Sequence, residues 1–143
     1  MMFQRETSFG YLVNLAARLF IRALDRRIGS HGLVHGQFPA LLMVWERPGL
    51  TQTEIAAAVS VEQPTMANTL NRMERDGLVE RRPDPDDRRR TLIFPAARAL
   101  AIRDAVLAEA GAVNALATRG MAEADRAEAI RLLRWMIGNL KAD

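Results

Sequence analysis

The polar side chains that could do chemistry gather in the segment 51–90. On a helix that begins between residues 61 and 63, Met66, Leu70 and Met73 lie three and four residues apart and must form the buried face. The opposite face then carries amides, hydroxyls and arginines instead of the Glu/Lys pairs of an ordinary solvated helix. Such groups hydrogen-bond base edges and phosphates. The residues expected to point outward are Thr65, Asn68, Asn71, Arg72 and Arg75.

A second group of charged residues follows that helix directly. The turn 83–87 is rich in proline and aspartate, and it is flanked by Arg81, Arg82, Arg88, Arg89 and Arg90. Considered alone, such a cluster is equally well explained as a salt-bridged loop. Its place after a polar-faced helix favours a binding role instead. Since the segment 51–90 holds seven arginines against eight acidic residues, that role depends on placement and not on excess charge.

The elements that position these groups can be read from local signals. Thr51 and Glu54 have the spacing of a capping box, which predicts a helix start. Ser60 and Val61 make a turn, and Pro64 is tolerated because it falls in the first turn of the next helix. Gly77 ends that helix, and two short strands are expected at 78–82 and 90–94. Two helices, a turn and a hairpin in this order are typical of a winged helix-turn-helix. The fold class is therefore mainly α with a small β wing.

Longer helices are expected on both sides of this unit. Apolar residues at three- and four-residue steps predict helices over 9–28, 37–46, 96–117 and 122–140. Thr7 or Ser8 can cap the first of them. The first and the last two carry more apolar surface than a small DNA-reading unit needs to cover. This surplus predicts a dimer interface built from both ends of the chain.

Composition restricts the class of protein further. The chain has 143 residues, 49% of them hydrophobic, a net charge of +3 and no cysteine. This is material for one domain, 1–143, without disulfides or thiolate metal sites. Charged residues interrupt the first ten positions, and the longest apolar run, 38–45, is too short for a membrane span. We therefore expect a soluble cytoplasmic protein without a membrane partner.

The sequence does not indicate a metal site or a catalytic site. His31 and His35 are expected to be loop histidines that face solvent, because neither a cysteine nor a nearby carboxylate would complete a zinc site. Phe38 and Trp45 are expected to belong to the core. No phosphate-binding glycine loop, serine elbow or HExxH pattern is present. We expect neither an enzyme nor a bound cofactor or metal.

Five short motifs together resemble the MarR family of transcriptional regulators over essentially the whole chain. They are Gly36-Gln37-Phe38, the segment 50–56, Gln63-Pro64-Thr65, the segment 73–79 and Asp87-Arg88-Arg89. The resemblance implies a homodimer with dimerisation helices at about 8–29 and 97–141 and a DNA-binding lobe at about 37–95. Each lobe would insert one helix into the major groove of a palindromic operator on double-stranded DNA.

The resemblance also assigns residue roles. Gln63, Pro64, Thr65, Asn68 and Arg72 would lie on the recognition helix. Arg89 would enter the minor groove, Asp87 would brace the wing, and Arg88 and Arg90 would contact phosphates. The implied function is a repressor released by a small aromatic or acidic effector, whose pocket the sequence does not locate. The alternative is a winged-helix module for protein interaction or DNA architecture, without effector control.

The chain departs from the family pattern in two places. The Leu-Thr pair that usually ends the second wing strand is Pro95-Ala96, and the following glycine is Ala99. Losing the threonine hydroxyl removes a helix cap worth about 1 kcal/mol, so a changed junction between wing and helix is expected. Asn68 stands where an arginine is common, and the operator sequence should differ accordingly.

Overall fold

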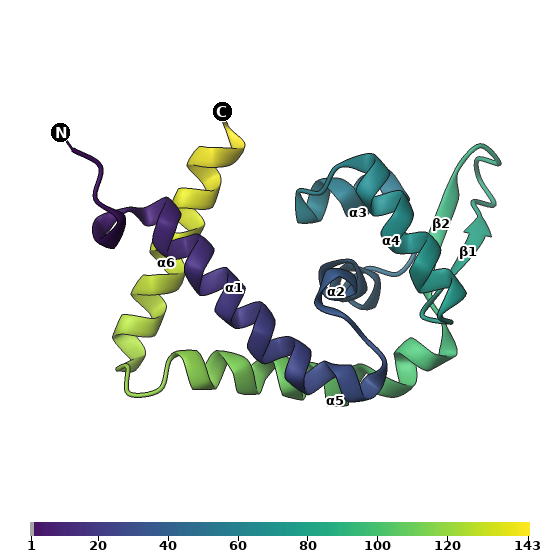
Figure 1. Ribbon diagram of the computed structural model, residues 1–143. Helices are drawn as coiled ribbons and strands as arrows, with labels where there is room; N and C mark the ends of the chain where they lie inside the picture. Colours follow the sequence, from purple (N-terminus) through teal and green to yellow (C-terminus); the bar gives the residue numbers. More distant parts are fainter. Residues whose placement is uncertain (1) are drawn as a thin grey trace.

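The computed structural model describes residues 2–143 as six α-helices and one two-stranded antiparallel sheet (Figure 1). The elements follow the expected order with small shifts of boundary. Three short 3-10 turns lie near the amino end and between the first two helices. The elements are η1 (Arg5–Thr7), α1 (Phe9–Ile28), η2 (Gly29–His31), η3 (His35–Gln37), α2 (Phe38–Glu46), α3 (Gln52–Val59), α4 (Gln63–Arg75), β1 (Val79–Pro83), β2 (Thr91–Pro95), α5 (Ala97–Ala117) and α6 (Glu123–Lys141).

The predicted helix caps are present. Ser8 accepts a hydrogen bond from the amide of Tyr11 at the start of α1. At α3, the amide of Glu54 donates to Thr51 Oγ1 at 3.2 Å, and the amide of Thr51 donates to Glu54 Oε1 at 3.4 Å. This reciprocal pair satisfies two amides that a helix start otherwise leaves unpaired. The start of α3 is thus fixed by local sequence.

Both wing strands lie one residue later than predicted, at 79–83 and 91–95 instead of 78–82 and 90–94. The cause is the way α4 ends. Gly77 adopts a left-handed conformation with φ of 75°, its amide donates to Glu74 O, and the amide of Leu78 donates to Met73 O. This is a Schellman closure, which keeps Leu78 in the helix end. Pro83, predicted to lie in the turn, is the last residue of β1, because a two-stranded sheet has only edge strands.

The core forms where α2, α3, α4, β2 and α5 meet. Its largest fully buried side chains include the predicted Met66, Leu70 and Met73 of α4. Trp45, also predicted to be in the core, is buried, and its Nε1 donates to the carbonyl of Ala99 at 3.1 Å. In Figure 1, α2 lies between the α3–α4 pair and the long α5. This packing holds α4 with its opposite face toward solvent.

The two ends of the chain are built differently. Helix α1 packs along α5, whereas α6 has no extensive contact with any other element of residues 2–143. Every residue of α6 is exposed except the half-buried Met136. The apolar side chains left uncovered in α1 and α6 include Phe9, Leu12, Val13, Leu133, Trp135, Ile137 and Leu140. The apolar surface of α6 is therefore not buried by the other elements of residues 2–143.

One polar junction connects α4 to the helices on either side of the core. The guanidinium of Arg98, in α5, donates to the carbonyl of Asp76 at 2.6 Å and to that of His31 at 2.8 Å. The buried Gln37 donates its Nε2 to Asp76 Oδ2 at 3.2 Å. The end of α4 is thereby joined to the end of α1 and the starts of α2 and α5. Ala96, the residue before α5, provides no side-chain cap for that helix.

A substitution at Gly32 tests how much this junction contributes to the stability of the fold. It has φ of 76°, and an added Cβ would meet Arg98 Nη2. Gly32→Ala should therefore lower the free energy of unfolding by about 2–3 kcal/mol, combining the left-handed backbone cost with weakened Arg98 hydrogen bonds. Gly77→Ala is the matched control, because Gly77 has the same φ with nothing near its Cβ position. It should cost only about 1 kcal/mol in urea unfolding. Equal losses for the two variants would show that the Arg98 junction contributes nothing.

Candidate nucleic-acid interface

The predicted reading face of α4 is exposed along its whole length. The exposed residues of this face are Gln63, Pro64, Thr65, Asn68, Asn71, Arg72 and Arg75. The opposite face of α4 carries the buried residues Met66, Leu70 and Met73. Gln63 also accepts a hydrogen bond at Oε1 from Gln52 Nε2, at 3.2 Å, which joins the starts of α3 and α4. The face therefore presents donors and acceptors from a helix that the core holds in place. That combination suits the edges of bases in a groove.

The wing carries an almost fully exposed cation near the tip. The side chain of Arg89 is 91% exposed, yet it is ordered by Asp87. Asp87 Oδ1 accepts from the Arg89 amide at 3.0 Å and from Arg89 Nε at 3.2 Å. Arg88, its neighbour, is also exposed. Asp87 thus orients the guanidinium without covering it, which is the arrangement a minor-groove arginine needs.

The hydrogen bonds from Arg89 also set the acid stability of the tip. The backbone amide of Arg89, followed by its side chain, holds the pKa of Asp87 below its ordinary value. A lowered folded-state pKa means that this contact is complete above the usual aspartate range and is lost as the pH falls through the folded-state value. We expect the Arg89 Nε–H resonance to stay constant between about pH 8 and about pH 5 and to move only in stronger acid. The Arg88 Nε–H resonance is the control and should not follow the same titration. Movement of Arg89 near neutral pH would contradict the pairing.

Arg90 occupies a different environment from the one predicted for a phosphate contact. Its Nη2 donates to Glu54 Oε1 at 3.0 Å, and its Nε lies 3.8 Å from Asp84 Oδ2. The contact with Glu54 crosses 36 residues and attaches the wing to the capping box of α3. Thr51, and to a smaller extent Arg90, lower the pKa of Glu54, so the carboxylate is ionised at neutral pH. This geometry favours Arg90 as a residue that positions the wing.

Two further wing arginines, expected as part of the charged cluster at the tip, make contacts within the domain. Arg81, on β1, donates to Glu74 Oε1 at 2.9 Å and to Asn71 Oδ1 at 3.0 Å, both on α4. The guanidinium of Arg82 lies 4.4 Å from the centre of the Phe94 ring. Arg82 also donates to Glu80 Oε2 on the same strand at 2.9 Å. No local pattern predicts the contacts with α4 and with Phe94, because those partners come from other elements. Of the five wing arginines, Arg88 and Arg89 remain exposed at the tip.

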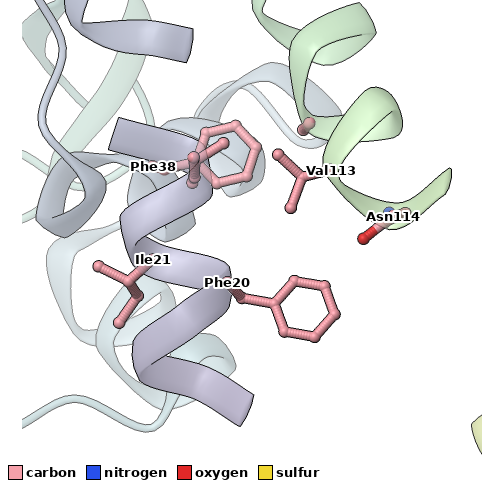
Figure 2. A pocket seen from close by; sticks show the side chains of 7 residues that line it. Phe20, Ile21, Phe38, Val113 and Asn114 are labelled. Carbon is pink, nitrogen blue, oxygen red and sulfur yellow. The ribbon is translucent and has the colours of Figure 1, made fainter. Parts of the chain in front are cut away.

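A separate apolar hollow lies between α1, α5 and the start of α2 (Figure 2). It has a volume of about 190 Å³. Phe20 and Ile21 come from α1, Phe38 begins α2, and Val113 and Asn114 belong to α5. Phe38 was predicted to be core, but it is only partly buried, because one side of its ring faces this hollow. Asn114 is the single polar side chain among the residues that line it.

The histidines differ from the prediction in two respects. His31, predicted to face solvent, is half-buried. His35 is exposed as expected, but Asp25 lies beside it: Nδ1 is 2.7 Å from Asp25 Oδ2, and the His35 amide donates to Oδ1 at 2.9 Å. The expectation of no nearby carboxylate was wrong, because the segment after α1 turns back and brings residue 35 beside Asp25 of that helix. A single carboxylate and one imidazole do not complete a zinc site. Among residues 2–143, no three His, Cys, Asp or Glu side chains cluster as metal ligands. In the same part of the chain, no helix combines the length and the apolar character needed to cross a membrane.

A helix pair followed at once by a hairpin whose strands pack on it defines a winged helix-turn-helix. The MarR family model matches residues 33–91. A putative transcriptional regulatory protein for the hcr operon of Thauera aromatica is 30% identical over 123 residues, which are 83% of this chain and 70% of that protein. The crystal structure of transcriptional regulator PA3341 superposes with a TM-score of 0.83 at 31% identity, covering 95% of this chain and 100% of that one. The chain belongs to the MarR family.

Some relatives match over a shorter stretch. The HTH-type transcriptional regulator TtmR of Methylorubrum extorquens strain PA1 is 34% identical over 89 residues, which are 62% of this chain and 46% of TtmR. The chain therefore spans about half the length of this relative. These relatives are named as transcriptional regulators and not as enzymes, which agrees with the expectation that no catalytic site is present.

Proposed function

We propose that this protein is a dimeric transcriptional repressor that binds palindromic operators on double-stranded DNA. The observation that carries the proposal is the exposed polar face of α4 next to a wing whose tip arginine is held outward by Asp87. A helix in the major groove and an arginine in the adjoining minor groove read two surfaces of one duplex. Such a regulator would act on promoter DNA in the cytoplasm.

Within this function the site residues have separate roles. Thr65, Asn68 and Arg72 lie three and four residues apart and would meet base edges and nearby phosphates, together with Gln63 and Pro64 at the start of α4. Arg89 would enter the minor groove, with Asp87 as its brace. Arg88 would contact phosphate. Arg90 would act chiefly by holding the wing, because Glu54 and Asp84 already share its charge.

The second copy of this chain would cover α1 and α6. The start of α1 and the end of α6 line a wide apolar groove of about 800 Å³, with Phe9, Val13, Leu133 and Ile137 among its residues. Exposed apolar patches of this kind mark interaction surfaces in soluble proteins. A two-fold interface from these helices would hold two α4 helices at a fixed separation, as a palindrome requires.

Fluorescence anisotropy tests DNA binding. We expect the purified protein to bind duplexes from the promoter region of its own or neighbouring genes with sub-micromolar affinity, and to prefer them to random duplexes of equal length. Affinity should fall steeply when salt rises from about 50 to about 200 mM, because phosphate contacts release counterions. Equal affinity for promoter and random duplexes would overturn the proposed repressor.

The hollow beside Phe38 suits the aromatic part of an effector. An apolar cavity of about 150 Å³ can hold a benzene ring, and this hollow has about 190 Å³. No charged side chain lines it, so a carboxylate on the same molecule would stay at its mouth in water. Because the hollow contacts both α1–α5 and the start of α2, an occupant could favour one spacing of the two α4 helices over another.

Filling the hollow tests the effector role. Ala110 lines it and is half-buried. We expect Ala110→Phe to leave operator affinity within about threefold of wild type but to abolish release of DNA by benzyl alcohol and benzoate. The two probes share one ring and differ in charge, and we expect both to act on the wild type. The matched control is Ala101→Phe, an exposed position on the same helix outside the hollow. Unchanged release from Ala110→Phe would place the effector elsewhere.

A further inference from the structure

Asn71 is an exposed amide whose orientation is fixed from within the domain. Its Oδ1 accepts a hydrogen bond from Arg81 Nη2 at 3.0 Å. A guanidinium has five N–H donors and no acceptor, so it can meet an amide only through the amide oxygen. The NH2 group of Asn71 therefore faces away from Arg81. On the outer face of α4, this residue offers hydrogen-bond donors.

Arg81 is itself held in place, so the orientation of Asn71 is not a chance rotamer. Its Nη1 donates to Glu74 Oε1 at 2.9 Å, and its side chain is only 24% exposed. Arg81 pairs with the buried Ile93 in the β1–β2 ladder, which fixes where the side chain leaves the wing. Arg81 thus joins the wing to α4 through two hydrogen bonds, one to Glu74 and one to Asn71.

Asn68, one turn earlier on α4, has no such restraint. It is exposed, and within residues 2–143 its side chain has no hydrogen-bond partner. Its amide can turn over to present either the oxygen or the NH2 group. Two asparagines on one reading helix therefore differ in the hydrogen bonds they can offer.

We propose that Arg81 is a specificity-determining residue that makes Asn71 a donor-only reader of DNA. Asparagine pairs with adenine by donating to N7 and accepting from the N6 amino group. Because its oxygen is turned toward Arg81, Asn71 presents its NH2 group, and not its acceptor, to the amino groups of adenine and cytosine. Guanine offers two acceptors, N7 and O6, to the NH2 group of Asn71, whereas adenine N7 and thymine O4 offer one each and cytosine offers none, so the preferred base facing Asn71 in each half-site is guanine. This inference rests on the proposed operator binding.

The test measures affinity for an operator in which each half-site position carries each of the four base pairs in turn. Wild type should prefer guanine by about tenfold at one position of each half-site, and Asn71→Ala should lose that preference. Arg81→Met keeps the apolar stem but frees the amide, and it should admit adenine at the same position. Arg81→Lys should retain the wild-type preference, because an ammonium also donates only. Arg82→Met, the neighbouring wing arginine, is the matched control and should change no base preference.

A thermal melt and the solution mass show whether each variant keeps the fold and the dimer. If Arg81→Met does not fold, Asn71→Asp serves instead, since a carboxylate accepts only and should redirect the preference to cytosine. An unchanged base preference in Asn71→Ala overturns the inference, as does an unchanged preference in folded Arg81→Met or in Asn71→Asp. Failure of the wild type to distinguish any operator from random duplex would instead overturn the proposed function.

Discussion

Replacing Leu133 and Ile137 with glutamate should convert the protein to a monomer that binds its operator at least about 100-fold more weakly. Both side chains are exposed on α6 and line the apolar groove with the start of α1. Two charges there would have to lose their water when a second copy covers the groove. A dimer gains 10²–10⁴-fold from placing two reading units on one duplex, and a monomer loses that gain.

Sedimentation or light scattering gives the mass of this double variant, and anisotropy gives its affinity for a full operator. The matched control is Ala124→Glu, an exposed residue in the first turn of α6 that does not line the groove. Acidic residues are favourable at a helix start, so this control should remain a dimer with wild-type affinity. A dimeric double variant would show that α6 is not the interface.

Arg89→Ala should lower operator affinity by about 10- to 100-fold while leaving the dimer and its melting temperature unchanged. The guanidinium is almost fully exposed and contacts Asp87 alone, so its removal costs the fold little. The proposed dimer would have two such arginines, and a minor-groove arginine is attracted most strongly where an A·T-rich groove is narrow. The loss should therefore be greatest for operators with A·T-rich sequence at the wing positions.

Arg88→Ala is the matched control for Arg89→Ala. Arg88 is equally cationic and adjacent, but we assign it to phosphate, so its loss should weaken binding to all sequences alike and reduce the salt dependence. A winged-helix module used for protein interaction would be indifferent to both changes. Unaltered operator affinity in Arg89→Ala would favour that alternative over a repressor.

Local features of this fold were predictable from the sequence because they depend on neighbouring residues. The Thr51–Glu54 capping box, the closure of α4 at Gly77 and the buried stripe Met66, Leu70 and Met73 all follow from spacings within one or two helical turns. The strands begin one residue later than predicted because the amide of Leu78 bonds to Met73 O at the end of α4. Strand propensity alone does not take this helix-end hydrogen bond into account.

The long-range contacts were not predictable in this way. Arg90 could be expected at a phosphate, but Glu54 meets it only after the wing folds back on α3. Arg81 looked like one more member of a charged cluster, whereas its partners Asn71 and Glu74 come from α4. The hollow beside Phe38 is lined by residues from α1, α2 and α5 together, so no single segment of the sequence predicts it. Residues of one charge and similar spacing thus acquire different roles from tertiary contacts.

The most direct test of the central claim, that two winged units of one dimer read a palindrome, is selection from a pool of randomised duplexes by the purified protein. We expect the recovered duplexes to share an imperfect inverted repeat whose half-site centres lie about 10 base pairs apart or a multiple of this spacing. Recovery of no shared sequence, or of a single unrepeated half-site, would contradict it.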